Sequence, residues 1–390
     1  MNIQETDKKY IASTYNRFPV TIVSGKGSIA VDENGKKYID MGSGIGVTSF
    51  GYCDEVWQKA ITDQINLVQH TSNLYYTEPC VKLAEMLTEK TGMSKVFFSN
   101  SGAEANECAI KVARKYAAEK RGKDCYNIVT LLNGFHGRTL TTLAATGQEH
   151  YHELFQPLTA GFKHVHAGDV AELKKVADPK TTAAIMIECV QGEGGVNVLP
   201  EEYVHTIEKY CKENDIVLII DEVQTGNGRT GKFYSYMNYG IQPDVVSTAK
   251  GLAGGLPMGA TILGPKVKDV LSFGDHGSTF GGNPVAAAAA VSIVKRIDNE
   301  LMDGVTQKGN LIKDFFKGDS NVEQISGMGL MVGIKPANKP AADVVKQCME
   351  NGVLCLTAKD KVRLLPPLNI SVDTLKQALN IIKSSLALSR

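Results

Sequence analysis

The sequence predicts an α/β protein with a mainly parallel central sheet and a smaller α+β domain beside it. Between residues 95 and 265, short apolar runs alternate with longer helical patterns. These runs are KVFF, NIVTLL, AAIMIE, IVLII, DVVST and GATILG. Strands that are apolar along their whole length and separated by helices indicate a parallel sheet covered on both faces. Glycine clusters follow several of these runs, at the sheet edge where ligands collect in this architecture.

The length and the order of segments predict two domains that share one cleft. A chain of 390 residues, 43% of them hydrophobic, is longer than the usual single domain. We expect residues 1–45 to form an N-terminal segment that packs with the small domain and contains a hairpin turning at Asn34-Gly35. The large domain is expected over residues 46–282, and a C-terminal small domain of helices and short strands over residues 283–390.

The composition argues against nucleic-acid and membrane partners. Lysine and arginine together number 42 and balance 42 aspartates and glutamates, so the chain has no basic field. The N-terminus lacks an apolar stretch of signal-peptide length, and no apolar run could cross a bilayer, so we expect a soluble, cytoplasmic protein. The eight cysteines include no C-x-x-C pair, which is typical of reduced thiols. Two H-x-H pairs lack a third ligand nearby, so no metal site is expected.

One predicted strand runs directly into a strong helix at Ser101, Gly102 and Ala103, in the segment KVFFSNSGAEANE. A helix N-terminus offers unpaired N–H groups and the positive end of the helix dipole, and glycine lets the backbone approach an anion closely. The segment therefore fits a phosphate site. An ordinary capping box, with Glu104 three residues after Ser101, explains the same residues equally well.

Two further strand ends carry a carboxylate and an amine. Asp221 and Glu222 follow IVLII, where a carboxylate needs a cationic or hydrogen-bonding partner such as a pyridinium nitrogen, although a turn cap is the common alternative. Lys250 ends a strand beside glycines that leave room for a flat ring, and burial would favour the neutral amine that imine formation requires. A solvated loop lysine is commoner. However, the two strands are successive, so Asp221 and Lys250 should share one edge of the sheet.

A fourth strand end carries Phe135 and Arg138, which could stack on a ring and bind a carboxylate with two hydrogen bonds. The turn HGSTFGGNP supplies the hydroxyls of Ser278 and Thr279. The run GNGRTG fits a dinucleotide-binding glycine pattern, but it does not directly follow the strand and no clear helix comes after it. We therefore expect no nucleotide site at this run.

Taken in order, NSGAEANE, FHGRT, QGEGG, DEVQTGNGRTG, STAKG and HGSTFGGNP resemble the motifs of class III aminotransferases of the pyridoxal-phosphate fold-type I superfamily. The resemblance covers nearly the whole chain, from about TYNRFPV to VRLLPPL. Within that class the likeness is greatest to the N-acetylornithine aminotransferases, supported by HTSNLYYTEP and CLTAKDKVRLLPPL. It implies pyridoxal 5'-phosphate as the cofactor and a homodimer with shared active sites.

The resemblance implies cofactor contacts for residues in these motifs, namely Ser101, Gly102, Ala103, Phe135, Asp221, Glu222, Val223, Gln224, Lys250 and Thr279. Asp221 would pair with the ring nitrogen, and Gln224 would contact the ring hydroxyl. Phe135 would stack on the ring, and Val223 would pack behind it.

The phosphate and the reacting carbon involve other members of this set. Gly102 and Ala103 would bind the phosphate, and Thr279 would reach the phosphate of the neighbouring subunit. Lys250 would form the imine and then move the proton between the substrate carbon and the cofactor carbon, a general acid/base task.

The resemblance also implies substrate contacts. Arg138 and Ser278 match positions that bind N-acetylornithine, and Arg363 matches the arginine that takes the α-carboxylate of 2-oxoglutarate or glutamate. Glu188 matches a gate that pairs with that arginine when an ω-amino substrate is present. Glu193 is the less favoured gate, because it lies in a glycine turn.

The implied reaction is transfer of the δ-amino group of N-acetylornithine to 2-oxoglutarate in arginine biosynthesis. Succinylornithine, ornithine and 4-aminobutyrate stay open as alternative donors, and an aminomutase would use the same scaffold without an external acceptor. A cofactor-sensing regulator would need a DNA-binding module, which this sequence does not show. The chain departs from the family at GYCDE, in place of a histidine-and-proline turn, and at Cys189, where proline commonly follows the gate glutamate.

Overall fold

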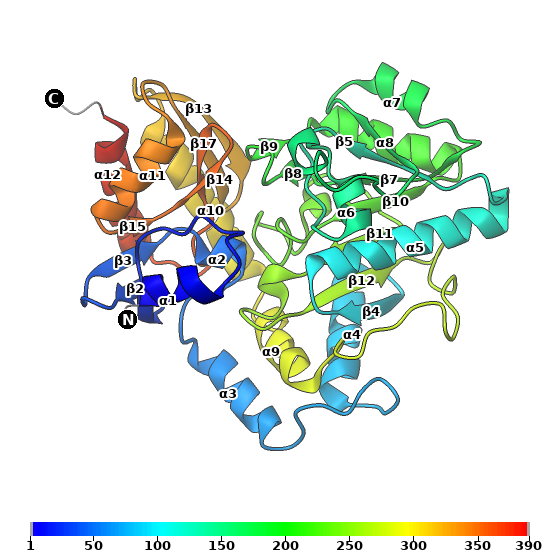
Figure 1. Cartoon of the computed structure of the whole chain (residues 1–390), viewed down its shortest axis with the longest axis horizontal. Helices are drawn as coiled ribbons and strands as arrows, with labels where there is room; N and C mark the ends of the chain where they lie inside the picture. Colours follow the sequence, from blue (N-terminus) through cyan, green and yellow to red (C-terminus); the bar gives the residue numbers. More distant parts are fainter. Residues whose placement is uncertain (1–2, 388–390) are drawn as a thin grey trace.

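A computed structural model describes residues 3–387 and has a seven-stranded sheet at its centre (Figure 1). The strand order is β4-β12-β11-β10-β7-β5-β6. These strands are β4 (Lys95–Ser99), β12 (Gly259–Leu263), β11 (Val245–Thr248), β10 (Val217–Asp221), β7 (Thr182–Ile187), β5 (Asn127–Leu131) and β6 (Phe162–Val165). Only β12 runs antiparallel to its neighbours, β11 and β4. The predicted α/β fold with a mainly parallel sheet is confirmed.

Helices cover both faces of this sheet, which explains why its central strands carry apolar residues on both faces. Successive side chains of a strand point to opposite faces. Leu218 and Ile220 of β10 join one core, whereas Val217 and Ile219 join the other. The first core is completed by α4 (Glu78–Thr91), α8 (Glu201–Glu213) and α9 (Pro284–Val294), and the second by α5 (Gly102–Arg121). Two short helices, α6 (Leu140–Ala145) and α7 (Val170–Val176), lie along the same half of the molecule (Figure 1).

The C-terminal part of the chain forms a separate layered unit, seen at the upper left of Figure 1. Its antiparallel sheet has the order β13-β14-β17-β16. The strands are β13 (Val322–Met328), β14 (Met331–Pro336), β17 (Lys361–Leu364) and β16 (Leu356–Ala358), and the helices are α10 (Asn299–Phe316), α11 (Ala341–Glu350) and α12 (Val372–Leu386). These elements share their own hydrophobic core.

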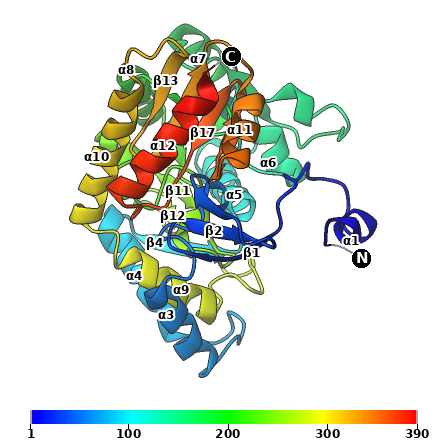
Figure 2. The same ribbon diagram turned by 90° about the vertical axis from the view of Figure 1, so that its left-hand side faces the viewer.

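The N-terminal strands lie against this C-terminal unit. They are β1 (Ile22–Lys26), β2 (Ile29–Asp32) and β3 (Lys37–Asp40), and β3 pairs in parallel with β15 (Val353–Leu354). The Asp32 carboxylate accepts hydrogen bonds from the Asn34 and Lys36 amides, which closes the β2–β3 turn where the sequence predicts a hairpin. Helix α1 (Ile3–Tyr10) has no buried residue and projects from the body (Figure 2). Helices α2 (Ser43–Gly46) and α3 (Glu55–Ile65) follow.

The predicted domain boundaries at residues 45 and 282 stay predictions. The side chains of Ile39 and Met41 belong to the C-terminal core. Helix α9 follows the predicted boundary, yet its buried residues belong to the core of the large sheet, where it packs with α3 and α4.

Within the described residues, the helices are too short or too polar to span a membrane, and possible metal ligands do not cluster. None of the helices within residues 3–387 is long and apolar enough to cross a bilayer. The same residues contain no group of three or more histidine, cysteine, aspartate or glutamate side chains that could hold a metal ion.

Candidate active site

A cavity of about 560 Å³ opens at the carboxyl ends of the parallel strands, the edge where such sheets bind ligands. Its volume lies in the range of small-molecule and cofactor sites. It brings together most of the predicted site, namely Ser101, Gly102, Ala103, Phe135, Arg138, Glu188, Asp221, Val223, Gln224 and Lys250.

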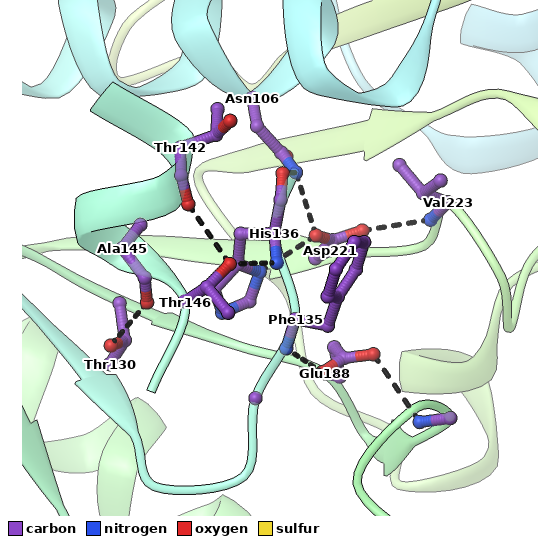
Figure 3. A network of polar contacts seen from close by, with 12 residues as sticks. Asn106, Thr130, Phe135, His136, Thr142, Ala145, Thr146, Glu188, Asp221 and Val223 are labelled. Carbon is purple, nitrogen blue, oxygen red and sulfur yellow. Dashed lines mark hydrogen bonds and ion pairs between the residues drawn. The ribbon is translucent and has the colours of Figure 1, made fainter. Parts of the chain in front are cut away.

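Asp221 lies at the centre of a buried polar network at the base of this cavity (Figure 3). Its Oδ2 atom accepts a hydrogen bond from Asn106 Nδ2 at 2.8 Å and lies 2.8 Å from His136 Nδ1. Its Oδ1 atom accepts from the Val223 amide at 2.9 Å. Burial disfavours the charged form of His136, but the hydrogen bond and charge of Asp221 outweigh it and raise the pKa of that imidazole. The carboxylate is therefore fixed in position by three contacts.

Lys250 follows the strand next to Asp221. Strands β10 and β11 pair in parallel with Asp221 opposite Ser247, so Lys250 comes three residues after the paired position. It begins the 3-10 turn Lys250–Leu252 with a φ of 47°, a backbone conformation that few non-glycine residues adopt. Burial lowers the pKa of its ammonium group, although the carboxylates of Glu193 and Asp221 oppose the shift. A lysine in this environment can supply a neutral amine.

The start of α5 is both a capped helix end and a wall of the cavity. Ser101 Oγ accepts from the Glu104 amide at 3.2 Å, and Glu104 Oε2 accepts from the Asn100 amide at 2.9 Å. Ser101 therefore caps the helix, but Glu104 bonds the Asn100 amide and not that of Ser101, so the reciprocal bond of a capping box is not formed. Gly102 is required by close packing, because a Cβ atom at this position would lie 2.5 Å from Val223 Cγ1. The first helical amides, at Gly102 and Ala103, have no acceptor within a helix and line the cavity.

Aromatic and cationic side chains meet at the mouth of the cavity. The Arg138 guanidinium lies 4.1 Å from the ring centroid of Tyr151 and 5.3 Å from that of Phe135. Arg138 is exposed to solvent. Its charge is thus available to an anionic group at the entrance.

Arg363 forms an ion pair with Glu193 and not with Glu188 in this structure. Arg363 Nη1, from β17, lies 2.6 Å from Glu193 Oε1 and donates to Gln224 Oε1 at 3.1 Å. Burial alone would raise the pKa of Glu193, but the Arg363 charge lowers it. Glu193 reaches Arg363 because it lies in the turn between β8 (Val190–Gln191) and β9 (Asn197–Val198), which lies against the C-terminal unit. The expected pairing of Arg363 with Glu188 in the presence of an ω-amino substrate stays a prediction.

The structure does not bring Glu222 to the cavity, and its expected contact with the cofactor stays a prediction. Its carboxylate accepts from the hydroxyls of Thr225 and Ser235, both at 2.6 Å, and from the Tyr236 amide at 3.0 Å. Glu222 instead holds the chain that follows β10.

Ser278 and Thr279 do not line the cavity of their own chain. Ser278 Oγ accepts from Asn100 Nδ2 at 3.2 Å and from the Gly281 amide at 2.9 Å, so it adjoins the wall of the cavity. Thr279 is exposed to solvent.

Two polar members of the site had no predicted role. His136 lies within the motif FHGRT, and Asn106 follows the motif start of α5 without a role implied by it. A sequence signal for Asn106 exists, because it lies four residues after Gly102 on α5, and such residues share one face of a helix. That face is the one that lines the cavity.

Comparisons with known proteins agree on one family. The family model described as aminotransferase class-III matches residues 10–386. The chain is 46% identical to the acetylornithine aminotransferase of Haemophilus ducreyi, over 99% of this chain and 98% of that one. It is 44% identical to the acetylornithine aminotransferase of Methanocaldococcus jannaschii, over 96% of both chains.

Solved structures give the same result. The crystal structure of ornithine aminotransferase from Toxoplasma gondii superposes with a TM-score of 0.94 at 32% identity, covering 98% of this chain and 94% of that one. N-acetylornithine aminotransferase from Stenotrophomonas maltophilia superposes with a TM-score of 0.84 at 30% identity, covering 98% and 97%.

The fold is therefore that of the fold-type I pyridoxal-phosphate transferases, and the cavity lies at the ligand-binding edge of its sheet. The chain belongs to the class-III aminotransferase family. Enzymes of this family are transaminases that depend on pyridoxal 5'-phosphate, so the activity class and the cofactor expected from the sequence are confirmed.

Proposed function

We propose that this chain transfers the δ-amino group of N-acetylornithine to 2-oxoglutarate, giving N-acetylglutamate 5-semialdehyde and glutamate, as a step of arginine biosynthesis in the cytoplasm. The observation that carries the proposal is the Arg363–Glu193 ion pair beside the cavity that contains Lys250. The names of its relatives support the donor, since the curated proteins at 40–46% identity are acetylornithine aminotransferases.

The cavity fits pyridoxal phosphate in shape and in donor set. A glycine at the start of α5 leaves a space that a Cβ would fill, and helix N-termini favour anions, so Gly102 and Ala103 would hold the phosphate. Asp221, fixed by Asn106 and His136, would hold the ring nitrogen. Phe135 would stack on the ring.

When bound, the cofactor supplies an electron sink for the carbanion formed at the reacting carbon. Lys250 Nζ is the group that removes the proton from the amino-bearing carbon of the donor, because burial lowers its pKa toward the neutral amine. Val223, against which Gly102 packs, would limit the depth of the ring. Gln224, in contact with both Glu193 and Arg363, would touch the edge of the ring.

One pocket must accept a neutral stem from the donor and a charged carboxylate from the acceptor. With Glu193 in place, the charge of Arg363 is compensated and a neutral stem can lie beside it. When Glu193 moves aside, the guanidinium can bind the α-carboxylate of 2-oxoglutarate with two hydrogen bonds. Arg138, at the mouth, would take the α-carboxylate of N-acetylornithine.

A homodimer is part of the proposal. Ser278 and Thr279 lie outside their own cavity and would reach the cavity of a second copy, Ser278 at the substrate and Thr279 at the phosphate. Large apolar side chains near this turn are exposed, including Leu74, Tyr76 and Phe280. Such a surface on one chain favours burial against another chain.

The substrate assignment is tested by steady-state kinetics with 2-oxoglutarate as the acceptor. N-acetylornithine, succinylornithine, ornithine and 4-aminobutyrate are compared as donors by kcat/KM. We expect N-acetylornithine to lead, and a clear preference for 4-aminobutyrate would refute the proposal. Turnover without 2-oxoglutarate would indicate an aminomutase instead.

A further inference from the structure

The carboxylate of Glu188 lies between two loops that serve different halves of the proposed reaction. Glu188 directly follows β7, whose neighbours in the sheet are β5 and β10. The loop after β5 carries Phe135, and the turn between β8 and β9 carries Glu193. Only 5% of Glu188 is exposed, and the residue lines the same cavity as Phe135.

Both oxygens of this carboxylate are used by backbone amides (Figure 3). Oε2 accepts from the Phe135 amide at 3.0 Å, and Oε1 accepts from the Gly192 amide at 3.4 Å. Burial raises the pKa of Glu188 to about 7, so above that pH the carboxylate is ionised and its hydrogen bonds are stronger than those between neutral groups. Among the described residues, the ion pairs of this region join His136 to Asp221 and Arg363 to Glu193, and none includes Glu188. The two amides are therefore its principal fixed partners.

The Gly192 amide is one peptide bond from the gate residue, and the turn there is tightly packed. A Cβ atom on Gly192 would lie 2.3 Å from Gln224 Oε1. Gln224 Nε2 in turn donates to Glu193 at 3.1 Å, and Gln224 Oε1 accepts from Arg363 at 3.1 Å. A shift of the Gly192 amide would therefore be transmitted directly to the Glu193–Arg363 pair.

We propose that Glu188 is a positioning residue that couples Phe135 to the Glu193–Arg363 pair by holding the amides of Phe135 and Gly192 with one carboxylate. The inference rests on the proposed function, since it explains how the position of Glu193 on Arg363 depends on the position of Phe135. We call the two hydrogen bonds from the Phe135 and Gly192 amides to Glu188 the clamp. While both are formed, Glu193 stays on Arg363 and the donor reacts. Loosening the clamp weakens the donor half-reaction and makes Arg363 easier to release to the acceptor.

The test uses Glu188→Gln in the holoenzyme. Glutamine has one acceptor oxygen, so one of the two amides loses its acceptor. Each half-reaction is followed separately by single-turnover absorbance, with N-acetylornithine as the donor and 2-oxoglutarate as the acceptor. At a pH above the raised pKa of Glu188, where its carboxylate is ionised, we expect kcat/KM for the donor half-reaction to fall about ten-fold, the usual effect of losing one charge-assisted hydrogen bond. The KM for 2-oxoglutarate should stay unchanged or decrease. Equal losses in both half-reactions would overturn the inference, because a general structural defect affects both.

A double-variant comparison tests whether Glu188 acts through Glu193. On a Glu193→Gln background, adding Glu188→Gln should change the ratio of the two half-reactions by less than about two-fold, since residues that act as a unit are not additive. Full additivity of the two single effects would contradict the coupling. Glu208→Gln is the matched control, because Glu208 also accepts from a backbone amide, that of Gln242, but lies outside the cavity.

Hydrogen exchange gives a readout that does not depend on activity. Glu188→Gln should speed exchange in the peptides that contain the amides of Phe135 and Gly192, and Glu208→Gln should not. Unchanged exchange in both peptides would overturn the clamp. If the glutamine variant does not fold, Glu188→Asp, whose shorter side chain cannot reach both amides, must give the same sign pattern. Failure of the wild-type donor half-reaction would refute the proposed substrate and leave the exchange test of the clamp standing.

Discussion

Lys250 is the residue on which the proposed chemistry depends. Its burial favours the neutral amine, and it lies in the same cavity as Asp221. Lys250→Ala should lose the covalent, borohydride-reducible link to the cofactor and the visible absorbance of the purified protein. Removal of the acid/base group should also lower kcat by about 10²–10⁴-fold. A reducible link retained in this variant would refute the assignment.

The titration of Glu188 gives a prediction for stability. Burial raises the pKa of Glu188 from 4.5 to about 7, with the charge of Asp221 adding to the shift and that of His136 opposing it. An acid whose pKa is raised on folding contributes stability fully below its unfolded pKa, and this contribution is lost as the pH rises through the folded pKa. The wild type therefore loses stability on this account between about pH 4.5 and pH 7.

Glu188→Gln does not titrate, so the difference in Tm between this variant and the wild type should become more positive over the same pH range. A shift of this size corresponds to about 3 kcal/mol. The measurement is thermal unfolding of the cofactor-free proteins from pH 4.5 to 8, with Glu208→Gln as the control for loss of a carboxylate. A difference that does not change with pH would show that Glu188 holds no proton in the folded state at neutral pH.

At the residue scale, the sequence predicted which side chains lie in the cavity better than it predicted the ion-pair partner of Arg363. The lysine, the aspartate and the helix start were predictable, because each follows an apolar run whose end must lie at one sheet edge. The partner of Arg363 was not, because Glu188 and Glu193 lie five residues apart and only the course of the β8–β9 turn decides which carboxylate reaches β17. The surroundings of Glu222 were not predictable either, because it lies just beyond β10 and its partners come from the chain that follows.

At the scale of elements, helix α10 offers two glycines with opposite expected effects. Gly304 lies in open surroundings, where a Cβ atom would meet only Lys308 Cε at 4.0 Å. Gly309 is packed against the backbone, where a Cβ atom would lie 2.2 Å from the carbonyl oxygen of Gly329. Gly304→Ala should stabilise the protein by about 0.5–1 kcal/mol, because alanine reduces the entropy of the unfolded chain.

Gly309→Ala should destabilise the protein by more than that gain, because α10 must move away from the turn before β14. Thermal unfolding of the two variants beside the wild type measures both effects with the same substitution in the same helix. A destabilised Gly304→Ala would contradict the open surroundings of that site.

The elements of the large sheet show what periodicity can and cannot predict. Six of its strands coincide with mainly apolar runs, since most of their residues are buried. The seventh, β6, has the sequence FKHV and lies at the edge of the sheet, where only one of its four residues is buried. A half-exposed edge strand carries lysine and histidine and gives no continuous apolar signal.

At the scale of the whole molecule, the separation of Ser278 and Thr279 from their own cavity requires an explanation. These residues lie in a turn near exposed apolar side chains, and Thr279 itself is exposed. In a two-fold symmetric dimer, a residue that reaches across the interface does so twice, so each chain would complete the cavity of the other.

This arrangement can be tested by mixing two inactive or weakened chains. Lys250→Ala lacks the proposed amine, and Thr279→Ala lacks the hydroxyl proposed to serve the second copy, which should lower cofactor affinity. In a mixed dimer, one cavity combines the intact Lys250 of one chain with the intact Thr279 of the other, whereas the second cavity lacks both. Unfolding and refolding the two variants together should therefore restore about a quarter of the wild-type sites, assuming random pairing into dimers.

The assay is run at limiting pyridoxal phosphate, so that sites lacking Thr279 contribute little. Each variant refolded alone, and the two mixed without unfolding, serve as controls for intrinsic activity and for exchange of chains. If Thr279 served the cavity of its own chain, every cavity in a mixed dimer would lack either the lysine or the hydroxyl, and mixing would restore nothing. Recovery after joint refolding thus distinguishes a shared active site from one completed within a single chain, whatever the size of the interface.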